Sequence, residues 1–62
     1  MLDEIDQKII RVLEKDARTS LRKISELVDV SLGTVSNRVK KMEKNGVIKG
    51  YSVILNPDEI GW

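Results

Sequence analysis

The 62-residue sequence predicts a mainly α-helical fold in which three helices are followed by one β-strand. Three stretches place apolar residues three or four positions apart, which is the spacing of one face of an α-helix. Each stretch follows a Ser or an Asp, residue types that cap helix N-termini. Residues 47–55 are instead rich in β-branched side chains and are bounded by Gly and Asn-Pro, which indicates a strand. We therefore expect a three-helix domain over residues 1–46, followed by a strand and linker over 47–62.

The first helix is expected within residues 1–16, with Asp3 as its N-cap. Glu4 and Asp6 would then lie in the first turn, where the helix dipole favours negative charge. Since capped helices normally carry such acids, we interpret them as structural and not as a catalytic pair. The predicted apolar stripe of this helix consists of Ile5, Ile9, Val12 and Leu13.

The second helix is expected to be short, about two turns long, with Ser20 as its N-cap. Residues 17–19 form the connection that precedes it. A tight turn of about three or four residues, which contains Asp29, leads from this helix to the next. Its predicted apolar positions are Leu21, Ile24, Leu27 and Val28.

The third helix is expected over Leu32–Lys44 and has the clearest boundaries. Ser31 is a favourable N-cap, and Asn45-Gly46 is a typical stop because Gly adopts the left-handed conformation readily. Lysines in the closing turns suit the negative end of the helix dipole. The apolar stripe of this helix is Val35, Val39 and Met42, and its opposite face carries Gly33, Asn37, Lys40, Lys41 and Lys44.

A short helix, a tight turn and a longer helix with a basic outer face form a helix-turn-helix arrangement. In that arrangement the second helix enters the DNA major groove while the first crosses the backbone. The net charge is only +1, but residues 17–49 carry eight basic and three acidic side chains, so basic charge is concentrated in this part. The sequence therefore predicts double-stranded DNA as the partner.

Individual side chains of this surface can be assigned roles in DNA binding. Asn37 can pair bidentately with adenine, and Lys40 can reach a guanine. Arg38 and Lys41 are expected to hold phosphates, as are basic residues around the second helix, Arg18 included. The clustering of these side chains on one helix argues against a merely solvated face. The predicted DNA-binding residues are Ser31, Gly33, Thr34, Ser36, Asn37, Arg38, Lys40, Lys41, Arg22 and Lys23.

Residues 47–55 form a lone strand, which would leave a row of unpaired backbone N–H and C=O groups. The same strand in a second copy can pair with it, so we expect a homodimer through an antiparallel ribbon. Gly50 inside the strand indicates a bulge or a close approach by another element of the chain. Asn56-Pro57 is typical of a turn or a capped first helical turn. Tyr51 and Trp62 are interpreted as packing residues and not as a base-stacking surface.

Several classes of protein are disfavoured by composition. The sequence has no cysteine and no histidine, no Gly-rich phosphate loop and no paired inward carboxylates, so we expect neither an enzyme nor a metal or other cofactor. No apolar run approaches the ~20 residues that span a bilayer, and the acidic start is unlike a signal peptide. We therefore expect a soluble, cytoplasmic protein with no membrane partner.

Five motifs in order carry a resemblance to a known family: L-D-E-I-D-x-K-I at 2–9, D-A-R-T-S-L at 16–21, S-x-x-T-V-S-x-R-V-K-x-M-E at 31–43, G-V-I-K-G-Y at 46–51 and N-P-x-x-I-G at 56–61. The chain resembles the DNA-binding domain of the Lrp/AsnC (leucine-responsive, feast/famine) transcription regulators. The resemblance implies a winged-helix-like three-helix domain and a hinge strand that helps to build the dimer. It also implies sequence-specific DNA binding, with Leu32–Lys44 as the recognition helix and Arg38 as the characteristic arginine of the family.

The family's second domain is a ferredoxin-like module that binds amino acids, and it would follow Trp62. The resemblance therefore implies no small-molecule effector in this chain. The chain departs from the family pattern at Asp29, where Gly is usual in the turn, and at Leu32, where Pro is common. Asp tolerates the left-handed conformation, so we expect the turn to form. An alternative function is a helix-turn-helix module that docks on another protein, which the fold alone does not exclude.

Overall fold

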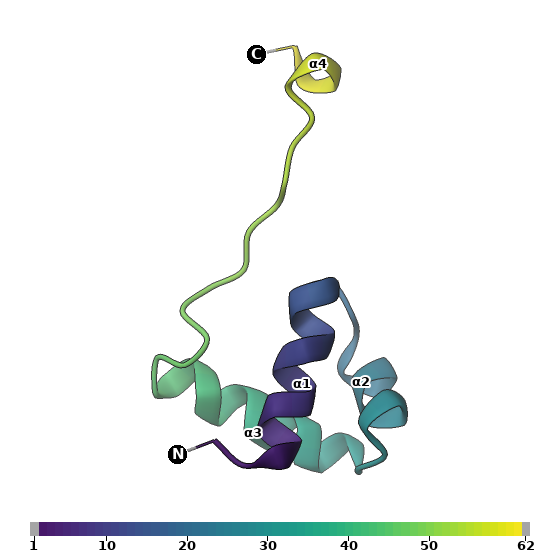
Figure 1. Ribbon diagram of the computed structural model, residues 1–62, viewed down its shortest axis with the longest axis vertical. Coiled ribbons are helices and arrows are strands. Elements are labelled where there is room, and N and C mark those ends of the chain that lie inside the picture. Colours follow the sequence, from purple (N-terminus) through teal and green to yellow (C-terminus); the bar gives the residue numbers. More distant parts are fainter. Residues whose placement is uncertain (1, 62) are drawn as a thin grey trace.

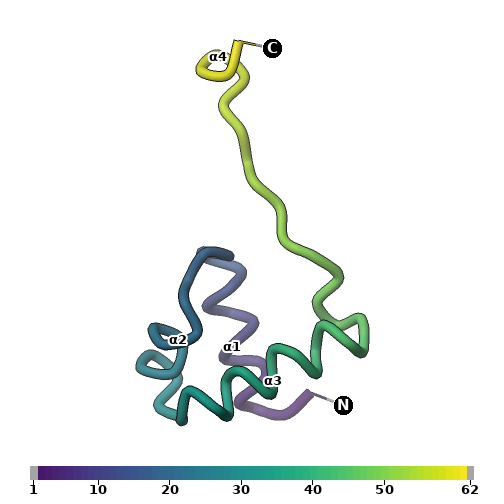
Figure 2. Tube along the Cα trace, turned by 180° about the vertical axis from the view of Figure 1, so that it is seen from behind, coloured from purple at the N-terminus to yellow at the C-terminus, as the bar shows by residue number. Residues whose placement is uncertain are grey.

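The computed structural model describes residues 2–61 and, within them, four helices. They are α1 (Glu4–Lys15), α2 (Leu21–Val28), α3 (Leu32–Lys44) and α4 (Pro57–Ile60). The first three pack against one another as a bundle, and an extended segment leads from the end of α3 to the short α4 (Figure 1). The view from behind shows the same separation between bundle and α4 (Figure 2). The predicted three-helix domain is thus confirmed as a helical fold.

Each bundle helix begins where its cap residue predicts. Asp3 and Asp6 form a reciprocal capping box, in which the Asp6 amide donates to Asp3 Oδ1 at 2.9 Å and the Asp3 amide donates to Asp6 Oδ2 at 3.3 Å. Ser20 and Ser31 cap α2 and α3, their hydroxyl oxygens accepting at 3.0 and 3.1 Å from the amide three residues on. The caps satisfy N–H groups that the helix itself leaves without partners.

Two left-handed residues end the second and third helices. Asp29 follows α2 with φ 61° and ψ 48°, so the aspartate adopts the conformation that the turn requires, as predicted. Gly46 follows α3 with φ 76°. Immediately after it, the amides of Val47 and Ile48 both donate to the carbonyl of Met42, at 2.9 and 3.1 Å. These bonds fix the start of the segment that leaves the bundle.

The core is formed by residues from all three bundle helices: Ile9, Ile24, Val28, Val35, Val39 and Met42. Leu27 was expected in the core but is 57% exposed, and Leu21 is also exposed. Only α1 and α3 pack on α2 within the described residues, so Ile24 and Val28 face the core while these two leucines lie on the flanks. The predicted α2 stripe was therefore too wide.

Residues 47 and 48 form a bend, residues 49–55 have no regular secondary structure, and residues 2–61 contain no β-strand. A strand is defined by a ladder with a neighbour, and a single copy of the chain offers this segment none. The predicted strand is therefore unconfirmed, and its pairing across a dimer is untested. After it, Asn56 caps α4 by accepting from the Asp58 amide at 3.0 Å, with Pro57 at the first helical position as expected.

No helix among residues 2–61 is long and apolar enough to cross a membrane. Trp62, interpreted above as a packing residue, lies outside the described residues.

Candidate nucleic-acid interface

Helix α3 separates its side chains into two faces, as its periodicity predicts. Val35, Val39 and Met42 are buried against the other helices. The opposite side is exposed and consists of Gly33, Asn37, Lys40, Lys41 and Lys44. Because the apolar stripe is fully engaged in the bundle, this second face is free to meet a partner.

The N-terminal turn of α3 carries hydroxyl groups that are already partly engaged. Ser31 Oγ and Thr34 Oγ1 lie 2.8 Å apart, and the same Ser31 oxygen accepts from the Thr34 amide. Thr34 and Ser36 are half-buried, whereas Ser31 is exposed. A Cβ built on Gly33 would have no atom within 4 Å, so the backbone there lies open to solvent. This turn offers a partner close access to the backbone and a small number of hydroxyl groups.

The three exposed lysines of α3 form no ion pair within the described part of the chain, where acidic partners are recorded only for Lys8 and Arg38. Arg22 and Lys23 are exposed on α2, the helix that packs against α3, and Arg18 is exposed in the connection before it. The basic residues predicted to meet phosphates therefore lie on neighbouring elements, with their charges uncompensated by the carboxylates of residues 2–61.

Arg38 differs from these basic residues, because its guanidinium contacts the first turn of α1. It donates to Asp3 Oδ2 and, at 3.3 Å, to Asp6 Oδ1. The side chain is 31% exposed, and that of Asp6 only 13%. The hydrogen bond from Arg38 lowers the pKa of Asp3, and the bonds to Asp3 and Asp6 raise the pKa of Arg38. Arg38 was predicted to hold a phosphate, but in the free protein it is occupied by two carboxylates.

Sequence reasoning missed this cluster of Asp3, Asp6 and Arg38. Asp3 and Arg38 are 35 positions apart, so no local pattern connects them. The available signal was the place of Arg38 on the shoulder of the α3 stripe, four positions before Met42, where a long side chain can reach a neighbouring helix. A small hollow of about 220 Å³ lies beside the cluster, and Asp6, Arg38 and Lys41 are among its lining residues.

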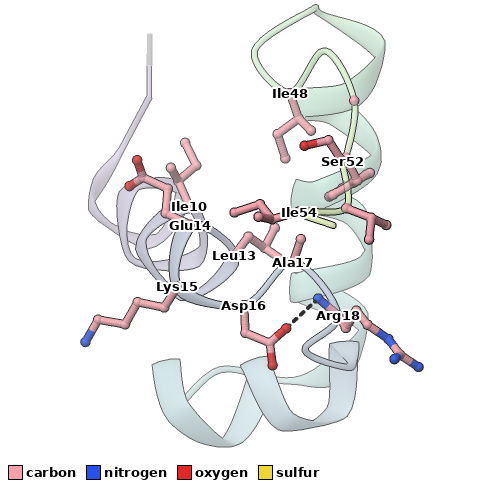
Figure 3. A pocket seen from close by; sticks show the side chains of 13 residues that line it. Ile10, Leu13, Glu14, Lys15, Asp16, Ala17, Arg18, Ile48, Ser52 and Ile54 are labelled. Carbon is pink, nitrogen blue, oxygen red and sulfur yellow. Dashed lines mark hydrogen bonds between the residues drawn. The ribbon is translucent and has the colours of Figure 1, made fainter. Parts of the chain in front are cut away.

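A larger cleft lies between the end of α1 and the extended segment (Figure 3). Its volume is about 550 Å³. Apolar side chains from both sides line it, including Ile10, Leu13 and Ala17 from α1 and its end, and Ile48, Val53 and Ile54 from the segment. At its rim, the Arg18 amide donates to Asp16 Oδ1 at 2.9 Å. An open apolar cleft of this kind is suited to cover by another apolar segment.

Comparisons with known proteins agree with this geometry. Residues 2–49 match the winged helix-turn-helix DNA-binding family. The chain is 50% identical over 62 residues to an uncharacterized HTH-type transcriptional regulator of Pyrococcus abyssi, covering all of this chain and 42% of that protein. It is 46% identical over 61 residues to the regulatory protein AsnC of Haemophilus influenzae, covering 98% of this chain and 41% of that protein.

Among solved structures, LrpC of B. subtilis is similar with a TM-score of 0.87 and 36% identity, covering 98% of this chain and 44% of that one. The chain thus spans about two fifths of the length of the curated relatives that it matches. The matched residues include α1, α2 and the whole of α3, on which the exposed basic face lies. The chain belongs to the winged helix-turn-helix DNA-binding family, and the proteins to which it is similar include the Lrp/AsnC regulators AsnC and LrpC.

Proposed function

We propose that this chain binds double-stranded DNA in a sequence-dependent way and serves as the DNA-reading part of a transcriptional regulator. The observation that carries the proposal is the exposed face of α3, in which Gly33, Asn37 and three lysines lie opposite a fully buried apolar stripe. In a helix-turn-helix protein the second helix enters the major groove with its N-terminal residues toward the bases. Helix α3 is the second helix of the α2–α3 pair, and its exposed polar and basic side chains support this role.

Each side chain of this face has a role that its chemistry allows. The amide of Asn37 is exposed and can make two hydrogen bonds to an adenine. Gly33 permits close approach of the backbone, and Lys40 can reach a guanine. Hydroxyl groups at the start of α3 and the basic residues of both helices would then contact base edges or phosphates. These are Ser31, Thr34, Ser36, Lys41, Arg22 and Lys23.

We further propose that the chain acts as a homodimer in which residues 47–55 of two copies pair as antiparallel strands. The segment is already extended, and its apolar side chains Val53 and Ile54 are 78% and 98% exposed. A partner that covered these side chains would remove apolar surface from water, which is favourable. Pairing would satisfy backbone groups that have no ladder partner in one copy. It would also bring apolar side chains of the second copy to the rim of the cleft beside α1. In this proposal residues 1–46 read DNA and residues 47–62 hold two reading domains together.

The test is selection of binding sites from a random duplex pool at near-physiological salt with this chain. Enrichment of a palindrome whose half-sites lie about one helical turn apart is expected, because two-fold related α3 helices would meet successive major grooves. Salt-sensitive binding without enrichment would mean that the chain supplies phosphate affinity alone, which overturns sequence readout. Absence of any DNA binding would favour a protein-docking module. We expect the protein to act in the cytoplasm, where it can reach chromosomal DNA.

A further inference from the structure

Arg38 lies in the middle of α3, but its side chain is directed to the beginning of α1. Its guanidinium bonds the carboxylates of Asp3 and Asp6, and these two residues also cap α1 by bonding each other's backbone amides. One cluster therefore joins the start of the first helix to the centre of the third. Within residues 2–61, the other side-chain hydrogen bonds that involve α3 stay in its own first turn or lead to Tyr51.

The shielded carboxylate of Asp6 favours this contact. The Asp6 side chain is largely shielded from water, and a shielded charge is unfavourable unless a partner compensates it. Arg38 supplies that compensation, and a guanidinium holds carboxylates with directional hydrogen bonds. If Arg38 left this site for a DNA phosphate, it would leave two close carboxylates without a counter-charge.

We propose that Arg38 is a positioning residue that fixes the rotation of α3 against α1 and makes no phosphate contact of its own. This inference rests on the proposed function, in which the exposed face of α3 reads DNA. The apolar stripe of α3 buries side chains without strong directionality. The hydrogen bonds of Arg38 are directional, and Asn37 immediately precedes it in the helix. The cluster therefore controls where Asn37 points.

Small rotations matter at this position. A helix with its side chains has a radius of roughly 5–6 Å, so a rotation of roughly 20° moves a side-chain tip by about 2 Å. Such a shift is enough to break a hydrogen bond, which tolerates only a few tenths of an ångström beyond its preferred length. Loss of the cluster should therefore reduce sequence discrimination while leaving general attraction to the DNA backbone intact.

The competing view is that Arg38 is a phosphate-binding residue that the two aspartates hold back. The two views predict opposite signs for removal of an aspartate charge. Freeing a phosphate-binding arginine, and removing a negative charge near DNA, would raise the affinity for every duplex. Loosening a positioning contact would lower the affinity for the selected sequence and not for random DNA.

The decisive variant is Asp6→Asn, because asparagine keeps one oxygen to accept from the Asp3 amide and replaces the charged oxygen that faces Arg38 with an uncharged NH2 group. For Asp6→Asn we expect about a tenfold loss of affinity for the selected duplex, little change for random duplex and an unchanged salt slope. Fluorescence anisotropy measures all three quantities. Arg38→Gln should behave in the same way, and the double variant should lose no more than either single one. Arg38→Lys should recover part of the discrimination.

The matched control is Glu4→Gln, which removes a carboxylate from the same helical turn. Glu4 pairs with Lys8 at 3.3 Å and is not a recorded partner of Arg38, so this variant should keep the discrimination of the wild type. Circular dichroism at the binding temperature shows which variants are folded. If Asp6→Asn is not folded, Asp3→Asn is tested in its place, since asparagine caps helices as well as aspartate does.

Two results would overturn the positioning role. One is a rise in affinity for both duplexes in Asp6→Asn that exceeds any rise in Glu4→Gln, which removes the same charge; the other is a salt slope lowered by about one unit in Arg38→Gln, the mark of a lost phosphate contact. If the wild-type chain itself selects no sequence, the proposed function fails and the positioning role fails with it. If the wild type selects a sequence and the charge-removed variants discriminate equally well, only the positioning role fails.

Discussion

The helical bundle and the segment that follows it differ in how much of their surface is buried within one copy of the chain. Every buried residue of the described chain lies between Asp6 and Met42, in the three bundle helices. Residues 49–61 are all exposed, although they include Val53, Ile54 and Leu55. The bundle thus buries its core side chains and pairs its buried polar groups within one copy. The segment has the composition of a buried strand, but one copy provides no neighbouring strand to cover it. Local signals suffice for the first region, whereas the strand proposed for the second would need another chain to pair with.

The largest expected effect comes from truncating the bundle core. Ile24 is fully buried, so Ile24→Ala should lower the free energy of unfolding by about 2–4 kcal/mol. A domain of this size has a total stability of roughly 3–9 kcal/mol, so the midpoint of thermal unfolding should fall by at least about 10 °C. Thermal denaturation followed by circular dichroism measures this.

Ile54→Ala is the matched variant in the segment, because it removes the same atoms from a side chain that is 98% exposed. At low micromolar protein its effect should stay within about 0.5 kcal/mol. If two copies pair through the segment, the effect should grow as protein concentration rises, since association then contributes to stability. Equal destabilisation by both substitutions at high dilution would contradict the comparison between the two regions.

The next effect concerns strand pairing. Proline lacks the amide donor of a ladder. The amides of successive strand residues point to opposite edges, so Val53→Pro and Ile54→Pro are compared as two single variants. At least one of them should weaken dimerisation about tenfold or more in sedimentation equilibrium at tens of micromolar. Val53→Thr keeps the amide and the β-branch, and it should remain dimeric. A wild-type chain that is strictly monomeric under these conditions would remove the proposed dimer altogether.

On the surface of the bundle, Asn37 and Lys41 should separate base readout from backbone attraction. Asn37→Ala should weaken the selected duplex by about 1–3 kcal/mol and relax preference at one base pair. Lys41→Ala should weaken selected and random duplexes alike and lower the salt slope by about one unit. Titration of both duplexes at several salt concentrations distinguishes these outcomes. Equal effects of the two substitutions on both duplexes would refute the assigned roles.

The difference between the regions also explains how much could be predicted from the sequence. The caps at Asp3, Ser20 and Ser31 and the left-handed turn at Asp29 depend on neighbours within a few positions, and all four are as predicted. The burial of Leu27 depends on which helices cover α2, so periodicity alone gave the wrong answer.

Local sequence patterns did not predict contacts between residues that are far apart in the chain. The face of α3 was predicted correctly because its helical periodicity also assigns its exposed side. The hydrogen bonds of Arg38 to Asp3 and Asp6 at the start of α1 were not predicted, because only the packing of the bundle brings these residues together. The strand at 47–55 stays a prediction for the same reason, since its partner would lie in another copy.

The smallest expected effect tests the one side-chain hydrogen bond that joins the bundle to the segment within residues 2–61. Tyr51 Oη, in the segment, donates to Glu43 Oε2, in α3, at 2.9 Å. Partial burial and the Glu43 carboxylate raise the pKa of Tyr51 above its ordinary value of 10.0, because both disfavour the phenolate. The stability that this contact contributes is therefore complete below pH 10.0 and is lost as the pH rises through the elevated pKa.

Tyr51 is the only tyrosine of the chain, so its ionisation can be followed alone by ultraviolet absorbance. The midpoint should lie above 10.0 in the wild type, and Glu43→Gln should bring it part of the way back, because burial continues to oppose the phenolate. Lys44→Gln serves as the control from the same helical turn. A wild-type midpoint at 10.0 would mean that the phenol is free in solution. The direction in which the segment leaves the bundle would then depend on the backbone bonds to Met42 and on the packing of Ile48 against the core, and the spacing of the two domains in the proposed dimer would be less tightly fixed.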